Sequence, residues 1–298
     1  MKLKHPPIRT LRSVATCTVT EWFEHNAASK GAALAFYTLF SMAPILVLVI
    51  AIAGLFYGQE AARGELFGQL NGLVGSQGAE AIQLILAGAH NEEQGRLATL
   101  IAGALLLFGA TTVFAELKAS LDAIWQLPPL TKGTVWDVVR TRLLSFGMVL
   151  VLGFLLMVSL VLSAALTLLE KYWAGLWQEA ALIMTVANWL VSFLVIAAMF
   201  GVIYKMLPRI KLSWSDVTIG AVGTALLFTL GKYAIGAYIG NSGVANSFGA
   251  AGSMIALLLW VYYSAQIFFL GAEFARQYAL QLGSLRHHRR DDAGNLAA

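Results

Sequence analysis

Residues 143–169 read LLSFGMVLVLGFLLMVSLVLSAALTLL, a run that is apolar almost throughout. A helix needs about 20 such residues to cross roughly 30 Å of hydrocarbon, so this run predicts a transmembrane helix that is long enough to tilt. The composition of the whole chain agrees, because only 12% of its 298 residues are charged, whereas soluble domains carry about 25%. The sequence therefore predicts an integral membrane protein.

Six stretches of the chain have the length and composition of a membrane span. They lie at approximately 34–56, 97–115, 143–169, 181–204, 217–239 and 250–270. The predicted fold class is all-α, a polytopic membrane protein with six transmembrane helices. We expect three parts: a cytoplasmic N-terminal arm over 1–33, the six-helix domain over 34–275, and a disordered basic tail over 276–298.

The distribution of Lys and Arg predicts the orientation. Sixteen lie in the two terminal segments and in the connections between spans two and three and between spans four and five, and three lie on the opposite side. Because Lys and Arg accumulate in cytoplasmic segments, both termini are predicted to be cytoplasmic. This basic rim favours contact with anionic membrane lipids over binding of nucleic acid.

Two segments outside the spans carry helical patterns. Leu11, Val14 and Trp22 share one face of a helix, with Arg12 and Glu24 elsewhere on the wheel. This pattern predicts an amphipathic helix that lies on the inner membrane face or packs on the protein's own cytoplasmic loops. The outer segment 57–96 predicts one or two short helices, since loops of this length usually hold structure or function.

Span one contains Pro44, preceded by Ser41. Proline removes a backbone hydrogen bond from a helix, so this pair predicts either an ordinary kink or a helix broken where it lines a substrate cavity. Glu116 and Glu273 are matched in depth at the inner ends of spans two and six. They are interpreted either as helix-end carboxylates paired with a neighbour such as Arg276, or as a cytoplasmic gate or ion-coupling site.

The stretch LFTLGKYAIGAYIG, residues 227–240, places Lys232 inside span five. A charged side chain within the bilayer costs at least about 2.5–3.5 kcal/mol on insertion scales. Lys232 either snorkels to the outer interface or faces an internal cavity that holds an anionic group. We adopt the second reading as the hypothesis: Lys232 points into the helix bundle and contributes to an anionic-substrate site.

Four blocks of the chain resemble the YihY/BrkB family of bacterial inner-membrane proteins. They are residues 26–55, 111–129, 205–239 and 249–275, the last reading GAAGSMIALLLWVYYSAQIFFLGAEFA. The resemblance implies six transmembrane helices with both termini inside. It brings an old ribonuclease label, and members are also described as virulence or serum-resistance factors or transporters. One departure is Asp122, where the family pattern leads us to expect asparagine.

Enzyme chemistry has little support in the sequence. The chain has no HExxH or GxSxG pattern, its single Cys17 excludes a CxxC metal site, and His5, His25, His287 and His288 do not fall at ligand spacing. We therefore expect no enzyme, no ribonuclease, no metal and no cofactor. The favoured function is a transporter or flippase of a lipid-like or amphipathic anionic substrate, with membrane lipids as partners; the alternative is a non-catalytic envelope scaffold.

Overall fold

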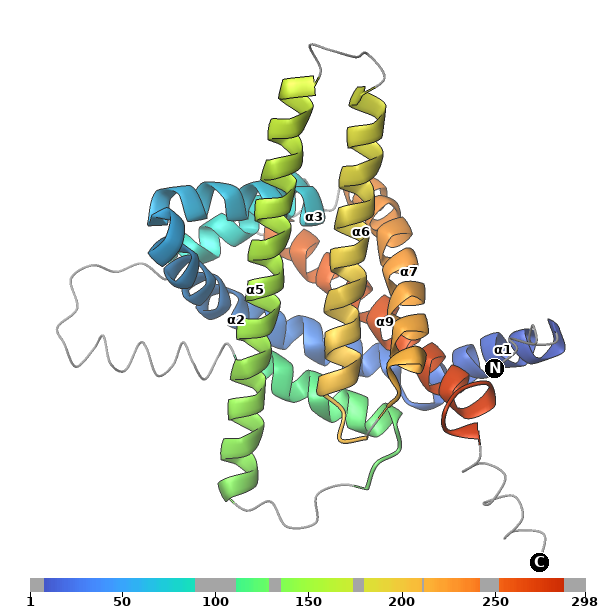
Figure 1. The fold of residues 1–298 in the computed structure, drawn as a ribbon. Helices are drawn as coiled ribbons and strands as arrows, with labels where there is room; N and C mark the ends of the chain where they lie inside the picture. Colours follow the sequence, from blue (N-terminus) through green and yellow to red (C-terminus); the bar gives the residue numbers. More distant parts are fainter. Residues whose placement is uncertain are drawn as a thin grey trace, which may run out of the picture.

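The computed structural model describes residues 8–88, 111–128, 135–173, 180–210, 212–241 and 252–286. All regular secondary structure in these ranges is helical, as Figure 1 shows, so the all-α class is confirmed. The helices are α1 (Ile8–Glu24), α2 (Ala27–Tyr57), α3 (Gln59–Gly88), one over residues 111–124, α5 (Val135–Trp173), α6 (Ala180–Met206), α7 (Trp214–Asn241) and α9 (Gly252–Gln281).

Four helices of the described part of the chain are long and apolar enough to cross a membrane. The apolar segments are Val139–Ser159, Thr185–Met206, Trp214–Tyr238 and Gly252–Gln281, which overlap predicted spans three to six. Predicted span one lies within α2, and most of predicted span two, 97–110, lies outside the described residues. A multi-pass membrane protein is supported, and the count of six spans stays a prediction.

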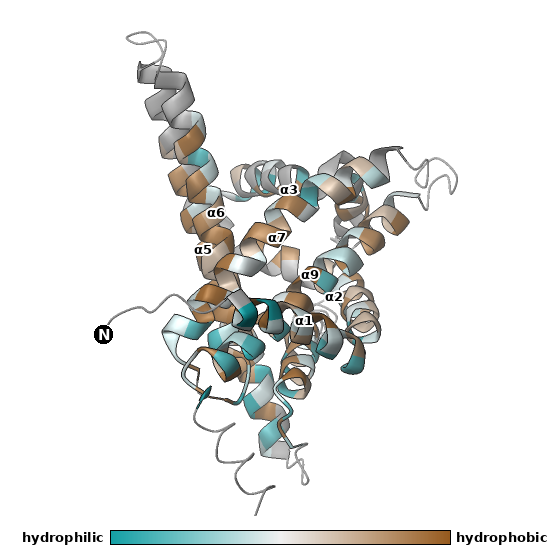
Figure 2. Cartoon of the chain, turned by 90° about the vertical axis from the view of Figure 1, so that its right-hand side faces the viewer, coloured by the Kyte–Doolittle hydropathy of each residue, from teal (hydrophilic) through white to brown (hydrophobic). Residues whose placement is uncertain are grey.

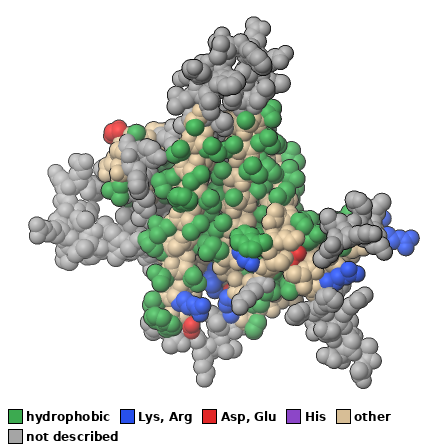
Figure 3. All heavy atoms as spheres, viewed as in Figure 1, with side chains coloured by type: hydrophobic (Ala, Val, Ile, Leu, Met, Phe, Trp, Pro, Cys, Tyr) green, Lys and Arg blue, Asp and Glu red, His purple; other side chains and the backbone are tan. Residues whose placement is uncertain are grey.

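The outward faces of α5 and α6 are apolar (Figure 2). Phe154 on α5 is 60% exposed and Leu194 on α6 is 63% exposed. Figure 3 shows hydrophobic side chains covering this face, with Lys and Arg gathered towards its lower edge. In water such a surface would be unfavourable, whereas in a bilayer it is solvated by acyl chains.

Helix α9 lies at the centre of the packing and contacts α1, α2, α3 and α7. Leu257, Phe269 and Ala279, spread along its length, are each 0% exposed. The helix also continues to Gln281, beyond the boundary at 275 that the sequence suggested. Because its neighbours come from both ends of the chain, α9 joins the N-terminal helices to the later spans (Figure 1).

A buried polar contact ties α6, α7 and α9 together. The Tyr204 hydroxyl on α6 lies 2.8 Å from the backbone oxygen of Phe268 and 3.1 Å from Oγ1 of Thr224. Gly271 permits this approach, since a Cβ at that position would lie 1.9 Å from Thr224 Oγ1. Small residues let membrane helices pack closely enough for such hydrogen bonds.

The helices outside the candidate spans differ in two ways from the sequence expectations. Helix α1 packs against another helix, α9, and buries Val14 and Thr18 there while Phe23 stays 68% exposed. Helix α3 is a single helix of 30 residues, where one or two short helices were expected.

Between α1 and α2 the chain turns at Asn26, whose φ of 52° lies in the left-handed region that asparagine tolerates.

Candidate functional site

A largely apolar groove opens between α7 and α9, with one wall from α1. Its volume is about 390 Å³, within the range of about 300–1,000 Å³ typical of small-molecule sites. Leu230, which is 69% exposed, lies at its edge, so the groove communicates with the apolar outer surface. The lining residues are Trp22, Leu227, Leu230, Gly231, Ala234, Tyr263, Gln266, Ile267 and Leu270.

Two residues that line the groove carry buried polar atoms that lack partners. Nε1 of Trp22 and both amide atoms of Gln266 are buried and have no hydrogen-bond partner among the residues that the structure describes. Leaving a buried polar group unpaired costs about 1–3 kcal/mol. The Gln266 amide lies against α2, since a Cβ added at Gly31 would lie 2.0 Å from its Nε2. It would therefore reach a ligand in the groove only after rotation of its side chain.

Lys232 follows a residue of this groove but does not itself line it. Its neighbour Gly231 does, and packs so closely on α9 that an added Cβ would lie 2.5 Å from Cδ1 of Ile267. The Lys232 side chain is half-buried, with Nζ 5.1 Å from the ring centre of Tyr233. Whether Lys232 holds an anion or snorkels therefore stays a prediction.

The structure places the two span-one residues in different situations. Ser41 is buried, 2% exposed, on α2. Helix α2 continues through position 44 without interruption. The side chain of Pro44 is not among those that the structure describes. The predicted bend and cavity at this proline thus stay a hypothesis.

Glu116 and Glu273, which the sequence matched in depth, both lie near Lys30. Burial lowers the pKa of Lys30 below its ordinary value, and the charges of Glu273 and Glu116 oppose that shift. Lys30 also donates a hydrogen bond to the backbone oxygen of His25. The two carboxylates therefore belong to one electrostatic environment, as a gate or coupling site would require, although their function stays a prediction.

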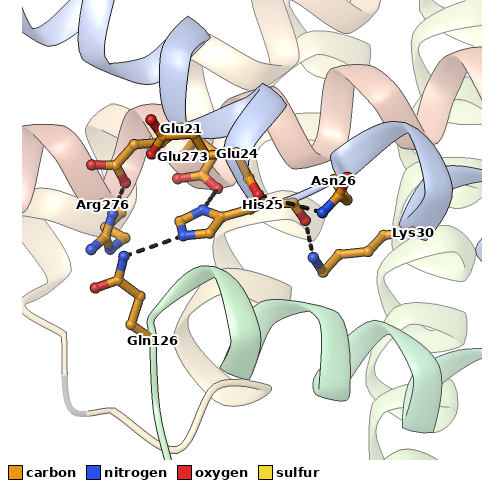
Figure 4. Close-up of polar contacts among 8 residues, drawn as sticks. All are labelled: Glu21, Glu24, His25, Asn26, Lys30, Gln126, Glu273 and Arg276. Atoms are coloured by element: carbon orange, nitrogen blue, oxygen red, sulfur yellow. Dashed lines mark hydrogen bonds and ion pairs between the residues drawn. The ribbon is translucent and has the colours of Figure 1, made fainter.

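Around Glu273 lies a group of residues that we call the α1–α9 polar cluster: Glu21, His25, Gln126, Glu273 and Arg276 (Figure 4). Nδ1 of His25 lies 2.6 Å from Oε1 of Glu273, and Nε2 of Gln126 lies 3.2 Å from Nε2 of His25. Arg276 donates to Oε2 of Glu21. The suggested pairing of Glu273 with Arg276 is thus replaced by pairs that reach across to α1.

Three residues of this cluster, Glu21, His25 and Gln126, were missed by sequence reasoning, and His25 is the one that contacts Glu273. It was set aside because histidines and acids are not at ligand spacing along the chain, yet 248 positions separate it from its partner Glu273. One local signal was available, since Glu21 and His25 stand four residues apart and so share a helix face.

A family model described as Virulence factor BrkB matches residues 18–295. The chain belongs to this family. The resemblance found in the sequence blocks is thereby confirmed. The match covers almost all of this BrkB-family chain, including the last part of α1, the groove and the polar cluster.

Several curated relatives of this BrkB-family chain are named UPF0761 membrane protein. That of Saccharophagus degradans is 24% identical over 263 residues, which make up 87% of this chain and 58% of the relative. That of Rhodospirillum centenum is 26% identical over 262 residues, 86% of this chain and 55% of the relative. That of Neisseria meningitidis serogroup B is 24% identical over 247 residues, 82% and 57% respectively. The chain spans little more than half the length of these relatives, and no solved structure matches it.

Asp122, noted as a departure from the expected family pattern, has a structural role here. Its Oδ1 accepts a hydrogen bond of 3.0 Å from the backbone N–H of Arg209, and its Oδ2 lies 2.8 Å from Nε of Arg209. Lys118 adds an ion pair at 3.3 Å. The carboxylate therefore fastens the segment after predicted span two to the connection between α6 and α7.

Proposed function

We propose that the protein is a transporter or flippase that binds a lipid-like or amphipathic anionic substrate in the groove between α7 and α9. The observation that carries this proposal is the groove itself, a site of about 390 Å³ with mainly apolar walls and with the exposed Leu230 at its edge. A scaffold protein has no need of such a groove, whereas a carrier of amphipathic molecules does.

The chemistry of the groove favours an acyl or other apolar chain with a polar group beside it. Its walls are mainly aliphatic and aromatic, and Leu230 brings its edge to the surface of an apolar helix. A substrate could therefore enter sideways from the bilayer without crossing water. For its polar part, the Gln266 amide would turn from Gly31 of α2 towards the groove, where it would offer a donor and an acceptor.

Lys232 supplies the preference for an anion in this proposal. It follows Gly231, a groove residue, and lies in a candidate span, where a cation is costly without a partner. A lipid phosphate or a carboxylate would provide that partner. Glu116 and Glu273 lie in the cytoplasmic half of the proposed path, where they would gate it or couple it to an ion.

The location and orientation belong to the same proposal. We place the chain in the bacterial inner membrane, as its resemblance to the YihY/BrkB family implies. Both termini would be cytoplasmic, as the asymmetry of Lys and Arg suggests. In a Cys17→Ser background, a cysteine at position 290 should resist an impermeant thiol reagent in intact cells, and one at position 60 should react. If only the cysteine at position 290 reacted, the orientation would be the opposite of the one proposed.

Transport is tested with purified full-length protein in vesicles that contain an acyl-labelled phosphatidylglycerol. We expect the protein to increase movement of the label between leaflets, and Leu230→Trp, which fills the groove edge, to reduce it at least about fivefold. Leu226→Trp is the matched control, because Leu226 is exposed on α7 but does not line the groove. Movement no faster than in protein-free vesicles would reject the flippase and favour the scaffold.

A further inference from the structure

We propose that Glu21, His25 and Glu273 bind a divalent transition-metal ion, with Zn²⁺ as the best fit, at the junction of α1 and α9. Each residue offers one ligand atom, and the three atoms lie within 4.8 Å of one another. Glu21 is on α1, His25 follows that helix, and Glu273 is on α9 (Figure 4). The ion would thus join the N-terminal helix to the central helix of the fold.

The state of Glu273 is a second, independent observation. Its side chain is 0% exposed, and only one of its two oxygens has a partner, His25. The other, Oε2, is buried with no hydrogen-bond partner in the described part of the chain. A buried carboxylate that is half satisfied is costly, and the positive charge of a cation bound to the carboxylate would offset that cost.

The contact between His25 and Glu273 is compatible with an ion in place of a proton. Nδ1 and Oε1 are now 2.6 Å apart, the distance of a hydrogen bond. Ligands of tetrahedral Zn²⁺ stand about 2.0–2.2 Å from the metal, and therefore about 3.3 Å from each other. If the two atoms moved apart by less than about 1 Å, from 2.6 Å to about 3.3 Å, the ion could take the place of the Nδ1 proton.

Two neighbours would support the ligands from outside. Arg276 already holds Oε2 of Glu21 and leaves its other oxygen available. Gln126 lies 3.2 Å from Nε2 of His25, and by turning its amide it would accept the Nε2–H of a metal-bound imidazole. Lys30 and Arg276 repel a cation, and the carboxylates of Glu21, Glu273 and nearby Glu116 oppose that repulsion.

The donor set selects among metals. One imidazole nitrogen with two carboxylates suits Zn²⁺ and similar transition metals, whereas Ca²⁺ and Mg²⁺ require mainly oxygen ligands. The side chains of His25 and Glu21 are 17% and 24% exposed, so a water could complete a fourth position. This inference does not depend on the proposed transport.

The test uses full-length protein, purified in mild detergent without a polyhistidine tag. Because His287 and His288 could bind metal on their own, both are replaced by alanine in every sample. We expect one Zn²⁺ per chain by elemental analysis after dialysis, and Co²⁺ visible absorption that Zn²⁺ abolishes. Glu273→Gln, His25→Gln and Glu21→Gln should each lower the affinity more than about 100-fold, and Gln126→Leu about 10-fold.

Glu24→Gln is the matched control, since Glu24 is an exposed carboxylate next to the site and is not one of the three ligands. Its affinity should equal that of the parent. Size-exclusion elution and helical circular dichroism show which variants remain folded. Because each of the three ligands is replaced in a separate variant, the test needs only one of these variants to fold. Less than about 0.1 Zn²⁺ per chain, or equal binding by a folded Glu273→Gln variant, would overturn the proposal.

Discussion

The outer pair α5 and α6 and the central helix α9 are all long apolar helices, but they reach stability differently. On α5 and α6, large side chains such as Phe154 and Leu194 face outward. On α9, charged and polar side chains, among them Glu273, Arg276 and Gln277, are buried together with the apolar ones. The stability of the outer pair depends on the apolar composition of the outward face, whereas the stability of α9 depends on which side chains contact each other.

This difference has a physical cause. An outward face meets lipid tails, which accept any apolar side chain of about the same size. An inward face meets fixed neighbours, so a change of volume or the loss of one hydrogen bond is felt directly. Substitutions in α9 and its partners should therefore cost much more than similar substitutions in α5 and α6.

The largest effect is expected for a glycine. Gly271→Ala on α9 places a Cβ 1.9 Å from Thr224 Oγ1 and should cost about 3 kcal/mol. Gly153→Ala on α5, where nothing lies within 4 Å of the added carbon, should be neutral or slightly stabilising. Unfolding in a detergent titration measures both, and equal effects would remove the distinction between inner and outer helices.

A smaller loss is expected at Asp122. Asp122→Ala leaves Arg209 and Lys118 without their carboxylate and should cost about 2 kcal/mol. Asp122→Asn, the residue expected in the family, should keep the bond from the Arg209 backbone N–H and lose less. Glu24→Ala is the exposed control. If that control destabilises as much as Asp122→Ala in the same titration, the fastening role is wrong.

Tyr204→Phe should cost about 1 kcal/mol, because it removes one hydroxyl shared by Thr224 and Phe268. Tyr233→Phe, which removes a hydroxyl from a ring that is 63% exposed, should have no measurable effect. Thermal unfolding of the two variants side by side makes this comparison. A neutral Tyr204→Phe would mean that the buried contact adds no stability.

The smallest effect on folding is expected at Lys232 on α7, the helix that contacts both α6 of the outer pair and the central helix α9. Lys232→Met and Lys232→Arg should both insert and unfold within about 0.5 kcal/mol of the parent. Their transport should differ: the arginine variant keeps part of it and the methionine variant loses it. If Lys232→Met transports the label as fast as the parent in these vesicles, Lys232 returns to the snorkelling explanation.

The sequence predicted the positions of the long apolar helices better than the contacts between them. Uniform apolar runs such as 143–169 are recognisable without any partner, and predicted spans three to six coincide with candidate spans in the structure. The polar cluster was not predictable, since His25 and Glu273 meet only after the fold brings α1 onto α9. Glu116 and Glu273 were singled out by depth, but their shared neighbour Lys30 was not.

The groove was also beyond sequence reasoning. Gly231 packs closely on Ile267 and Tyr263 of α9, whereas a Cβ added at Gly236 of the same helix would have nothing within 4 Å. Nothing in the local sequence distinguishes the two glycines, because the difference lies in where α9 crosses α7. Trp22 entered the groove from a helix that the sequence placed outside the membrane domain.

The central claim, that the groove between α7 and α9 holds an amphipathic anion, is tested most directly by identifying what the purified protein retains. Native mass spectrometry after mild-detergent extraction should find one anionic amphiphile on the parent and on Leu226→Trp, and at least about fivefold less on Leu230→Trp. Retention of the same molecule to the same extent by all three, or of none by the parent, would contradict it.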